Sequence, residues 1–213
     1  HGVHLVLADR NQIGLARTAS EASRLGVECA TFHYDAEVAD QVTNLARFAS
    51  SVGEGVDILV NNAGVTYHGP TDRMRMDHWQ RLMETNVMAP VRLTQELFPS
   101  FIERPEAHIL NVCSALGLVG LPKVCAYSTT KFALVGYSES LRAEFSKQGI
   151  GVTALCPGLV RTNLFTSSIN DTAPKKKTPP DWVCTSPERV ARRSSPSAAS
   201  GPGPSSGCRS CCR

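Results

Sequence analysis

Three polar side chains in the middle of this chain, Ser114, Tyr127 and Lys131, have the types and the spacing of an acid–base site. Tyr127 and Lys131 are four residues apart in a stretch whose apolar residues recur at helical spacing, so both lie on one helix face. A phenol has a pKa of about 10, and an ammonium one turn away favours the phenolate and lowers that pKa toward neutrality. Such a phenol can give a proton to a carbonyl oxygen or take one from an alcohol. Ser114 ends an apolar run that predicts a buried strand, and its hydroxyl can hydrogen-bond the same substrate oxygen.

Short apolar runs alternate with helical patterns along most of the chain. The predicted strands cover residues 3–8, 27–33, 56–60, 108–113 and 152–156, and the predicted helices cover 11–25, 37–52, 77–101 and 126–148. In the third helix we expect Asp77 to be the cap and Pro90 to introduce a kink. The alternation predicts an α/β domain, a doubly wound parallel sheet with helices on both faces.

The composition is that of a globular domain with a mildly acidic body and a basic end. A chain of 213 residues with 42% hydrophobic side chains is long enough for one domain with a sizeable core. Residues 161–213 hold 9 Lys and Arg against 3 Asp and Glu, which leaves the first 160 residues with a net charge of −3. A basic tail can touch nucleic acid or a membrane surface, but we expect a solvated tail and no nucleic-acid partner. No apolar run reaches the length of a membrane span.

The cysteines and histidines favour a cytoplasmic protein without a metal site. Cysteines lie scattered in or beside apolar runs, which favours reduced thiols, at positions 29, 113, 125 and 156. A second group at positions 208, 211 and 212 has no further ligand pair nearby, so we predict no zinc site there. The histidines show no spacing typical of a catalytic triad or a metal site.

Further motifs stand around the Ser–Tyr–Lys set in a fixed order. Asn61-Asn62-Ala63-Gly64 follows a predicted strand, and Asn86 lies in a predicted helix 41 residues before Tyr127. Pro157-Gly158 follows the last strand, with Thr162 shortly after it. In this order the motifs resemble the short-chain dehydrogenase/reductase family over about residues 3 to 165. The resemblance implies a Rossmann-like sheet and an oxidoreductase that transfers a hydride between NAD(P) and an alcohol or ketone.

The resemblance also implies a role for each catalytic residue. Tyr127 is the acid/base at the substrate oxygen, and Ser114 hydrogen-bonds that oxygen. Lys131 lowers the Tyr127 pKa and holds the nicotinamide ribose. Asn86 holds a water that links Lys131 to solvent; the alternative is an asparagine inside a helix with local hydrogen bonds only.

Other matched residues would contact the cofactor. In the family Asn61 braces the central sheet, and the backbone of Ala63 and Gly64 packs against the adenosine side. Pro157 and Gly158 border the nicotinamide, and the hydroxyl of Thr162 reaches its carboxamide. An ordinary turn at the end of a strand is the alternative for this last segment.

Asp9 and Arg10 bear on the choice between NAD and NADP. A carboxylate at the tip of this strand accepts hydrogen bonds from the ribose hydroxyls and repels a 2′-phosphate, which favours NAD. Arg10 could instead pair with that phosphate, which would favour NADP. We expect NAD or NADP, with NAD favoured by Asp9, and a solvated loop pair is the alternative. By the resemblance Asp35 approaches the adenine ring; the alternative is a helix cap.

The family's first strand and its Gly-rich turn have no counterpart in this sequence. Gly53-Glu54-Gly55 precedes a strand rather than following one, and the strand that ends at Asp9 matches the family's second. We therefore expect a fragment whose sheet lacks its central first strand and which binds cofactor poorly. We expect residues 1–165 to form this incomplete domain and 166–193 a substrate-lid region with a short helix capped by Ser186. Residues 194–213 would be a disordered tail, and their atypical composition suggests a shifted reading frame.

The function expected from the whole sequence is oxidation of an apolar alcohol or reduction of an apolar ketone. The expected pocket wall is apolar and consists of Leu116, Leu118, Val119, Leu121, Leu164 and Phe165. By the resemblance the helix near 77–101 and the catalytic helix form subunit faces, which implies a homodimer or homotetramer. One alternative is an inactive truncated chain that only pairs with other subunits, as the missing glycine turn suggests. Another, a sugar-nucleotide epimerase, is disfavoured by the motif at 61–64 and by the short C-terminal region.

Overall fold

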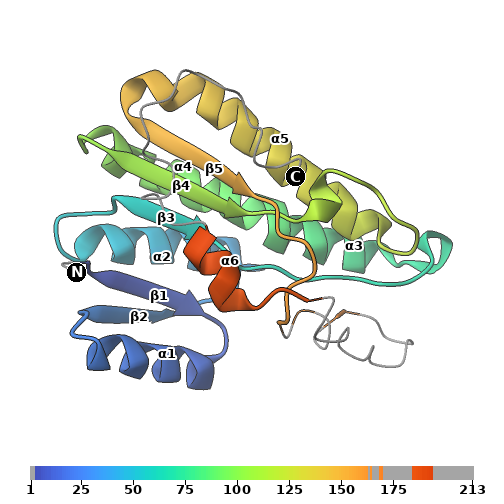
Figure 1. Cartoon of the computed structure of the whole chain (residues 1–213), viewed down its shortest axis with the longest axis horizontal. Coiled ribbons are helices and arrows are strands. Elements are labelled where there is room, and N and C mark those ends of the chain that lie inside the picture. The colour runs from blue at the N-terminus through green and yellow to red at the C-terminus, as the bar shows by residue number, and fades with distance from the viewer. Residues whose placement is uncertain (1–2, 163, 165–167, 170–183, 194–213) are drawn as a thin grey trace.

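The fold is built from two groups of parallel strands. A computed structural model describes residues 3–162, 164, 168–169 and 184–193. Strand β1 (Leu5–Asp9) pairs with β2 (Cys29–His33). Strands β3 (Ile58–Asn61), β4 (Ala107–Val112) and β5 (Ile150–Leu155) form the second group, in the order β3-β4-β5. Among the described residues no strand pairing joins β1 to β3. The architecture is the Rossmann-like α/β fold that the sequence predicts, and all strands point the same way (Figure 1).

In the described part of the chain, six α-helices cover the strands from both sides (Figure 1). They are α1 (Gln12–Arg24), α2 (Ala39–Ser51), α3 (Met76–Met83), α4 (Ala89–Ile102), α5 (Cys125–Phe145) and α6 (Pro187–Arg193). Helices α2 and α4 pack on each other and on one face of the second strand group, where α5 lies along β5. Helix α1 packs on β1 and β2.

The helix ends follow from local hydrogen bonds. The predicted cap at Asn11 is confirmed, since its side chain accepts from the backbone N–H of Gly14 at 3.1 Å. The predicted cap at Ser186 is also confirmed, because its hydroxyl accepts from the N–H of Arg189 at 3.3 Å. The prediction that Asp77 caps the third helix is wrong. Asp77 lies inside the first turn, where it forms an ion pair with Arg75, the residue just before the helix.

The third predicted helix is broken by a π-helical segment, Glu84–Met88, that separates α3 from α4. Pro90 lies at the start of α4, and proline has no N–H to donate to the carbonyl four residues earlier. That carbonyl belongs to Asn86. The irregularity expected at Pro90 is therefore the wider, π-helical turn at Asn86.

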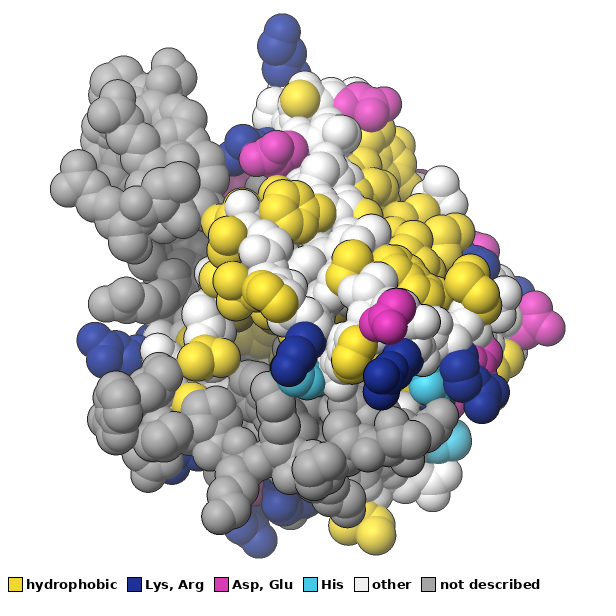
Figure 2. Space-filling view, turned by 90° about the vertical axis from the view of Figure 1, so that its right-hand side faces the viewer, with side chains coloured by type: hydrophobic (Ala, Val, Ile, Leu, Met, Phe, Trp, Pro, Cys, Tyr) yellow, Lys and Arg dark blue, Asp and Glu magenta, His cyan; other side chains and the backbone are white. Residues whose placement is uncertain are grey.

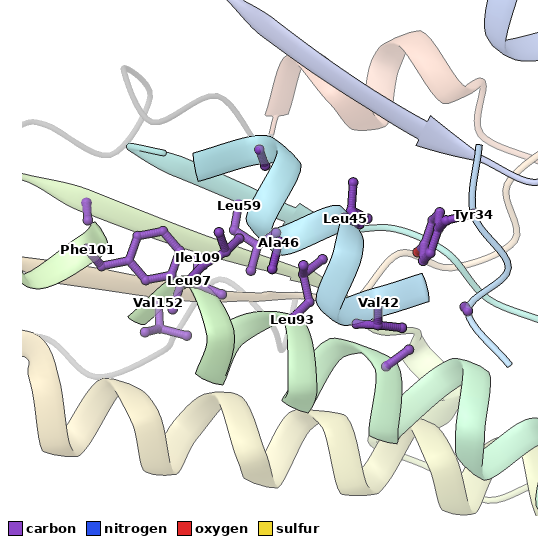
Figure 3. Close-up of a cluster of buried hydrophobic side chains, with 14 of the residues drawn as sticks. Tyr34, Val42, Leu45, Ala46, Leu59, Leu93, Leu97, Phe101, Ile109 and Val152 are labelled. Carbon is purple, nitrogen blue, oxygen red and sulfur yellow. The ribbon is translucent and has the colours of Figure 1, made fainter. Parts of the chain in front are cut away.

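The main hydrophobic core lies between α2, α4 and one face of the second strand group (Figure 3). Its strand contribution comes from alternate residues, because successive side chains of a strand point to opposite faces. Leu59, Ile109 and Val152 point into this core. On the opposite face of β3, Ile58 and Val60 keep 52% and 51% of their surface exposed. The second group is therefore packed tightly on one side only.

Several predictions concern residues that the structure does not describe. They are the tail at 194–213, Phe165, and most of the lid region, of which only 168–169 and 184–193 are described. In the described part of the chain, no helix is both long and apolar enough to cross a membrane.

Candidate active site

Ser114 lies two residues after the end of β4, at the carboxyl end of the strand. Its extended backbone ends the strand, and its hydroxyl accepts from the N–H of Leu116 at 3.1 Å, which starts a short turn of 3₁₀ helix. The next residue, Ala115, donates to the carbonyl of Pro157 at 2.8 Å. The loop after β4 is therefore bonded to the loop after β5, and both meet at one edge of the sheet.

Tyr127 and Lys131 lie on the same face of α5, as their spacing predicts, and both are buried. The Lys131 ammonium lies 5.8 Å from the centre of the Tyr127 ring and donates to the carbonyl of Val112 at 2.8 Å. Gly117 permits the close approach of the Ser114 loop to α5, because a Cβ there would lie 2.7 Å from the Lys131 carbonyl oxygen. The hydroxyl of Ser114 is near enough to the Tyr127 phenol to lower its pKa. The structure thus brings the three predicted residues together.

The pKa values in this site differ from those expected from the sequence. Burial raises the pKa of the Tyr127 phenol above its ordinary value, and the hydrogen bond from Ser114 offsets part of the rise. Burial lowers the pKa of Lys131 to about 8. The prediction that Lys131 lowers the Tyr127 pKa toward neutrality is therefore wrong for the protein alone. Lys131 loses its proton first, so it is neutral at the pH where Tyr127 ionises.

Asn86 is fully buried in the π-helical segment and is held on three sides. Its side-chain oxygen accepts from the N–H of Val65 at 2.8 Å, and its amide donates to the Val65 carbonyl at 2.9 Å. The amide also donates to the hydroxyl of Thr130 at 3.0 Å, and Thr130 donates to the carbonyl of Tyr127 at 2.8 Å. These bonds connect Asn86 to the turn of α5 that carries Tyr127. No sequence pattern pointed to Thr130, which is an ordinary helix residue by type.

A network of buried polar side chains joins the elements that carry the site residues. The amide of Asn61 donates to Asn111 at 2.8 Å, and the amide of Asn111 donates to the hydroxyl of Ser138 at 2.8 Å. The network joins β3 and β4 to α5, so it fixes the helix that carries Tyr127 against the strand that carries Ser114. Asn111 was not predicted as a site residue, although an asparagine within an apolar run is a usable signal for such a network.

The predicted cofactor residues fall into two places. Gly64 lies beside the catalytic residues, since a Cβ there would be 3.4 Å from the Asn86 side-chain oxygen and 3.7 Å from the Lys131 nitrogen. Asp9 and Asp35 lie on the other strand group, at the carboxyl ends of β1 and β2. Of the remaining residues, Ala63, Gly158 and Thr162 are exposed on the loops after β3 and β5, and Pro157 is half-buried on the loop after β5.

Apolar side chains surround the Tyr127 side of the site. Tyr127 packs in a cluster with Val65, Tyr67 and Leu82, against which Leu116 and Leu164 pack. Leu118, Val119 and Leu121 are all more than two-fifths exposed. Figure 2 views the side of the molecule toward which the strands point, and apolar side chains gather on this face. No three His, Cys, Asp or Glu side chains group as metal ligands among the residues that the structure describes.

A parallel α/β sheet with an acid–base pair where its strands end is typical of Rossmann-like enzymes. The short-chain dehydrogenase family model matches residues 1–173, and the chain belongs to this family. It is 33% identical over 174 residues to dehydrogenase/reductase SDR family member 7B of Xenopus tropicalis, covering 79% of this chain and 56% of that protein. The chain thus spans little more than half the length of this relative.

Two solved structures with the same fold carry a bound cofactor. One is a short-chain dehydrogenase/reductase from Burkholderia phymatum in complex with NAD, with a TM-score of 0.76 and 28% identity, covering 83% of this chain and 66% of that one. The other is a gluconate 5-dehydrogenase from Burkholderia cenocepacia in complex with NADP and tartrate, with a TM-score of 0.69 and 29% identity. The match covers 78% of this chain and 66% of that protein.

Proposed function

We propose that this chain carries the acid–base site of an oxidoreductase that interconverts an alcohol and a ketone with NAD(P). The observation that carries the proposal is the Tyr127 phenol, which is buried, lies near Ser114 and is adjacent to the Lys131 ammonium. A phenol in this setting can transfer a proton at a substrate oxygen held by the same serine hydroxyl. Family membership supports the same reaction class.

The pKa directions favour ketone reduction at neutral pH. Because burial raises the pKa of Tyr127, the phenol is protonated there and is ready to donate its proton to a carbonyl oxygen. Lys131, with a pKa of about 8, is still charged at neutral pH and is available to hold the nicotinamide ribose. Ser114 donates to the substrate oxygen and orients it. Asn86 holds the loop at Val65 and the first turns of α5 together.

The chain's residues fit the two ends of a dinucleotide cofactor, which when bound would supply or accept the hydride. At the nicotinamide end Lys131 would hold the ribose, while the Pro157–Gly158 loop and Thr162 would border the ring. A Cβ at Gly158 would meet no atom within 4 Å, so there is room beside this loop. At the adenosine end the exposed Asp9 carboxylate suits ribose hydroxyls, and we infer that NAD is preferred.

We further infer that the sheet is completed by a strand between β1 and β3 that is not among the described residues. The pairing supports this, since among the described residues β1 pairs only with β2, and β3 pairs only with β4. The half-exposed Ile58 and Val60 on β3 also support it, because buried strands of parallel sheets are covered on both faces. A Gly-rich turn after such a strand would hold the pyrophosphate.

The substrate that this site fits best is an apolar alcohol or ketone. The apolar walls at Leu116 and Leu164 support this choice. A similar protein of Nostoc, 29% identical over 171 residues, is a ketoacyl reductase, whose substrates carry a carbonyl group. We propose a cytoplasmic homodimer or homotetramer. An inactive chain that only pairs with other subunits is less favoured, because the catalytic residues are assembled in contact.

The test is hydride transfer by this chain, followed through loss of NADH or NADPH absorbance with a panel of apolar ketones. We expect turnover that falls by roughly 10² to 10⁴ in Tyr127→Phe, the usual contribution of a positioned acid–base group. Tyr137→Phe, on the same helix, is the matched control and should retain most of the rate. Reduction should slow as the pH rises through about 8, because Lys131 loses its charge there. Equal rates in both variants would refute the role of Tyr127.

A further inference from the structure

A group of charged side chains stands beside Asp9 at the adenosine end of the proposed cofactor site. This group, here called the Glu37 cluster, consists of Asp9, Arg10, Asp35, Glu37 and Arg81. Arg81 on α3 donates to both oxygens of Glu37, at 3.0 Å each. Arg10 approaches the same carboxylate at 3.8 Å. One carboxylate therefore holds two guanidinium groups that come from different parts of the chain.

Glu37 is itself fixed by the loop that carries it. Its backbone N–H donates to the side chain of Asp35 at 3.0 Å, and its own side chain is only 24% exposed. Hydrogen bonding to Glu37 raises the pKa of Arg81, as expected for a charge-assisted pair of this geometry. Burial raises the pKa of the Tyr34 phenol, and the nearby carboxylates of Asp9 and Asp35 raise it further. The cluster is thus a connected set and not a scatter of surface charges.

The Glu37 cluster should affect the binding of a phosphate at the adenosine 2′ position. Arg10 follows the strand-tip carboxylate and is the cation that could bind such a phosphate. In the structure it is paired with Glu37 instead, and its carbonyl is in contact with the His33 ring nitrogen at 3.2 Å. The cluster carries three carboxylates against two guanidinium groups, a formal charge of −1. A dianionic phosphate would have to displace Glu37 from Arg10 and would meet a net negative site.

We propose that Glu37 is a specificity-determining residue, which holds Arg10 away from the adenosine 2′ position and so selects a dinucleotide without a 2′-phosphate. This inference rests on the proposed function and deepens it. Asp9 repels the phosphate directly, whereas Glu37 acts by pairing with Arg10. Replacing Glu37 by glutamine keeps the size of the side chain, removes its charge and brings the formal charge of the cluster to zero.

The experiment measures binding of two adenosine probes, 5′-AMP and adenosine 2′,5′-bisphosphate, to the full chain by NMR titration. We expect Glu37→Gln to raise the affinity ratio of bisphosphate to 5′-AMP by about three- to fivefold, a size typical of partly exposed charge pairs. The gain should disappear in the double variant Glu37→Gln with Arg10→Ala. It should also shrink at high salt, which screens exposed charges.

A matched control is available at the opposite ends of the same two strands. Glu28→Gln removes a carboxylate that pairs with His4, just before β2 and β1 begin, and should leave the ratio unchanged. The inference is overturned if Glu37→Gln leaves the ratio unchanged, if the gain persists without Arg10, or if Glu28→Gln produces the same gain. If neither probe binds, the chain has no adenosine site, and both the NAD(P) assignment and this inference fail. If both probes bind and Glu37→Gln leaves their affinity ratio unaltered, this inference alone fails.

Discussion

The carboxyl ends of β3, β4 and β5 differ from those of β1 and β2 in burial and in the contacts that hold their side chains. At the first, Asn111 is fully buried and Asn61 nearly so, and a neutral hydrogen bond of 2.8 Å joins them. At the second, Asp9 and Arg10 are exposed and are held by ion pairs and backbone contacts. Buried hydrogen bonds allow few alternative geometries, whereas exposed ion pairs are screened and adjust easily. The acid–base half is therefore preorganised, and the adenosine half is tunable.

The helices explain why the two halves differ. Helices α4 and α5 place buried residues along most of their length against the second strand group. Helix α1, which packs on β1 and β2, buries only Leu15 among its 13 residues. Catalysis of proton transfer needs fixed distances, which the first arrangement provides. Recognition of the charged end of a nucleotide depends on the balance of charges around it. Exposed side chains at the carboxyl ends of β1 and β2 can supply that balance.

A large stability effect should come from breaking the buried network at Asn111. We expect Asn111→Ala to lower the free energy of unfolding by roughly 2–4 kcal/mol, because it removes the partner of the Asn61 amide and leaves a small cavity. Urea denaturation measures the change. Asn44→Ala is the control, since Asn44 is an exposed partner of Arg47 and should cost less than about 0.5 kcal/mol. Similar losses of unfolding free energy in both variants would contradict the contrast between the buried acid–base half and the exposed adenosine half.

The sequence predicted the parts of this molecule that depend on periodicity and on local chemistry. The alternation of apolar runs located every strand of both groups, and the Tyr127–Lys131 spacing located the face of α5. It could not predict contacts between residues distant in sequence, such as Thr130 with Asn86 or Arg81 with Glu37. The sequence also predicted the wrong direction for the shift of the Tyr127 pKa. The effect of burial depends on tertiary packing, which the spacing of residues in the sequence does not show.

A second effect should appear in the pH dependence of stability. The pKa of Lys131 is 10.5 unfolded and about 8 folded, so between these pH values the unfolded chain binds more protons. The free energy of unfolding should therefore rise with pH across this window, by roughly 2–3 kcal/mol between pH 7 and pH 10. The raised pKa of Tyr127 acts in the opposite sense only above about pH 10.

The measurement compares wild type with Lys131→Met, in which this rise should be absent. Denaturant unfolding at a series of pH values gives the difference between the two proteins. Lys147→Met, at the exposed end of α5, is the control and should follow the wild type. A Lys131→Met curve parallel to that of the wild type would mean that Lys131 keeps its ordinary pKa.

The smallest effect concerns the two faces of β3 and sharpens the comparison within one strand. Ile58→Ala should lower the free energy of unfolding by less than about 1 kcal/mol, because half of the side chain already faces water. Leu59→Ala, on the buried face, should cost roughly 2–4 kcal/mol. Thermal or urea unfolding measures both. Equal costs would show that another segment covers the outer face of β3.

The most direct test of the account is the titration of the Tyr127 phenol, which requires neither cofactor nor substrate. The four tyrosines carry a ¹³C label at Cζ, and the Tyr127 signal is assigned by its loss in Tyr127→Phe. The account predicts that Tyr127 ionises above pH 10, and that Ser114→Ala raises its pKa further by removing the hydrogen bond that favours the phenolate. Ionisation at or below pH 10, or no response to Ser114→Ala, would contradict the buried, serine-bound phenol on which the proposed chemistry depends.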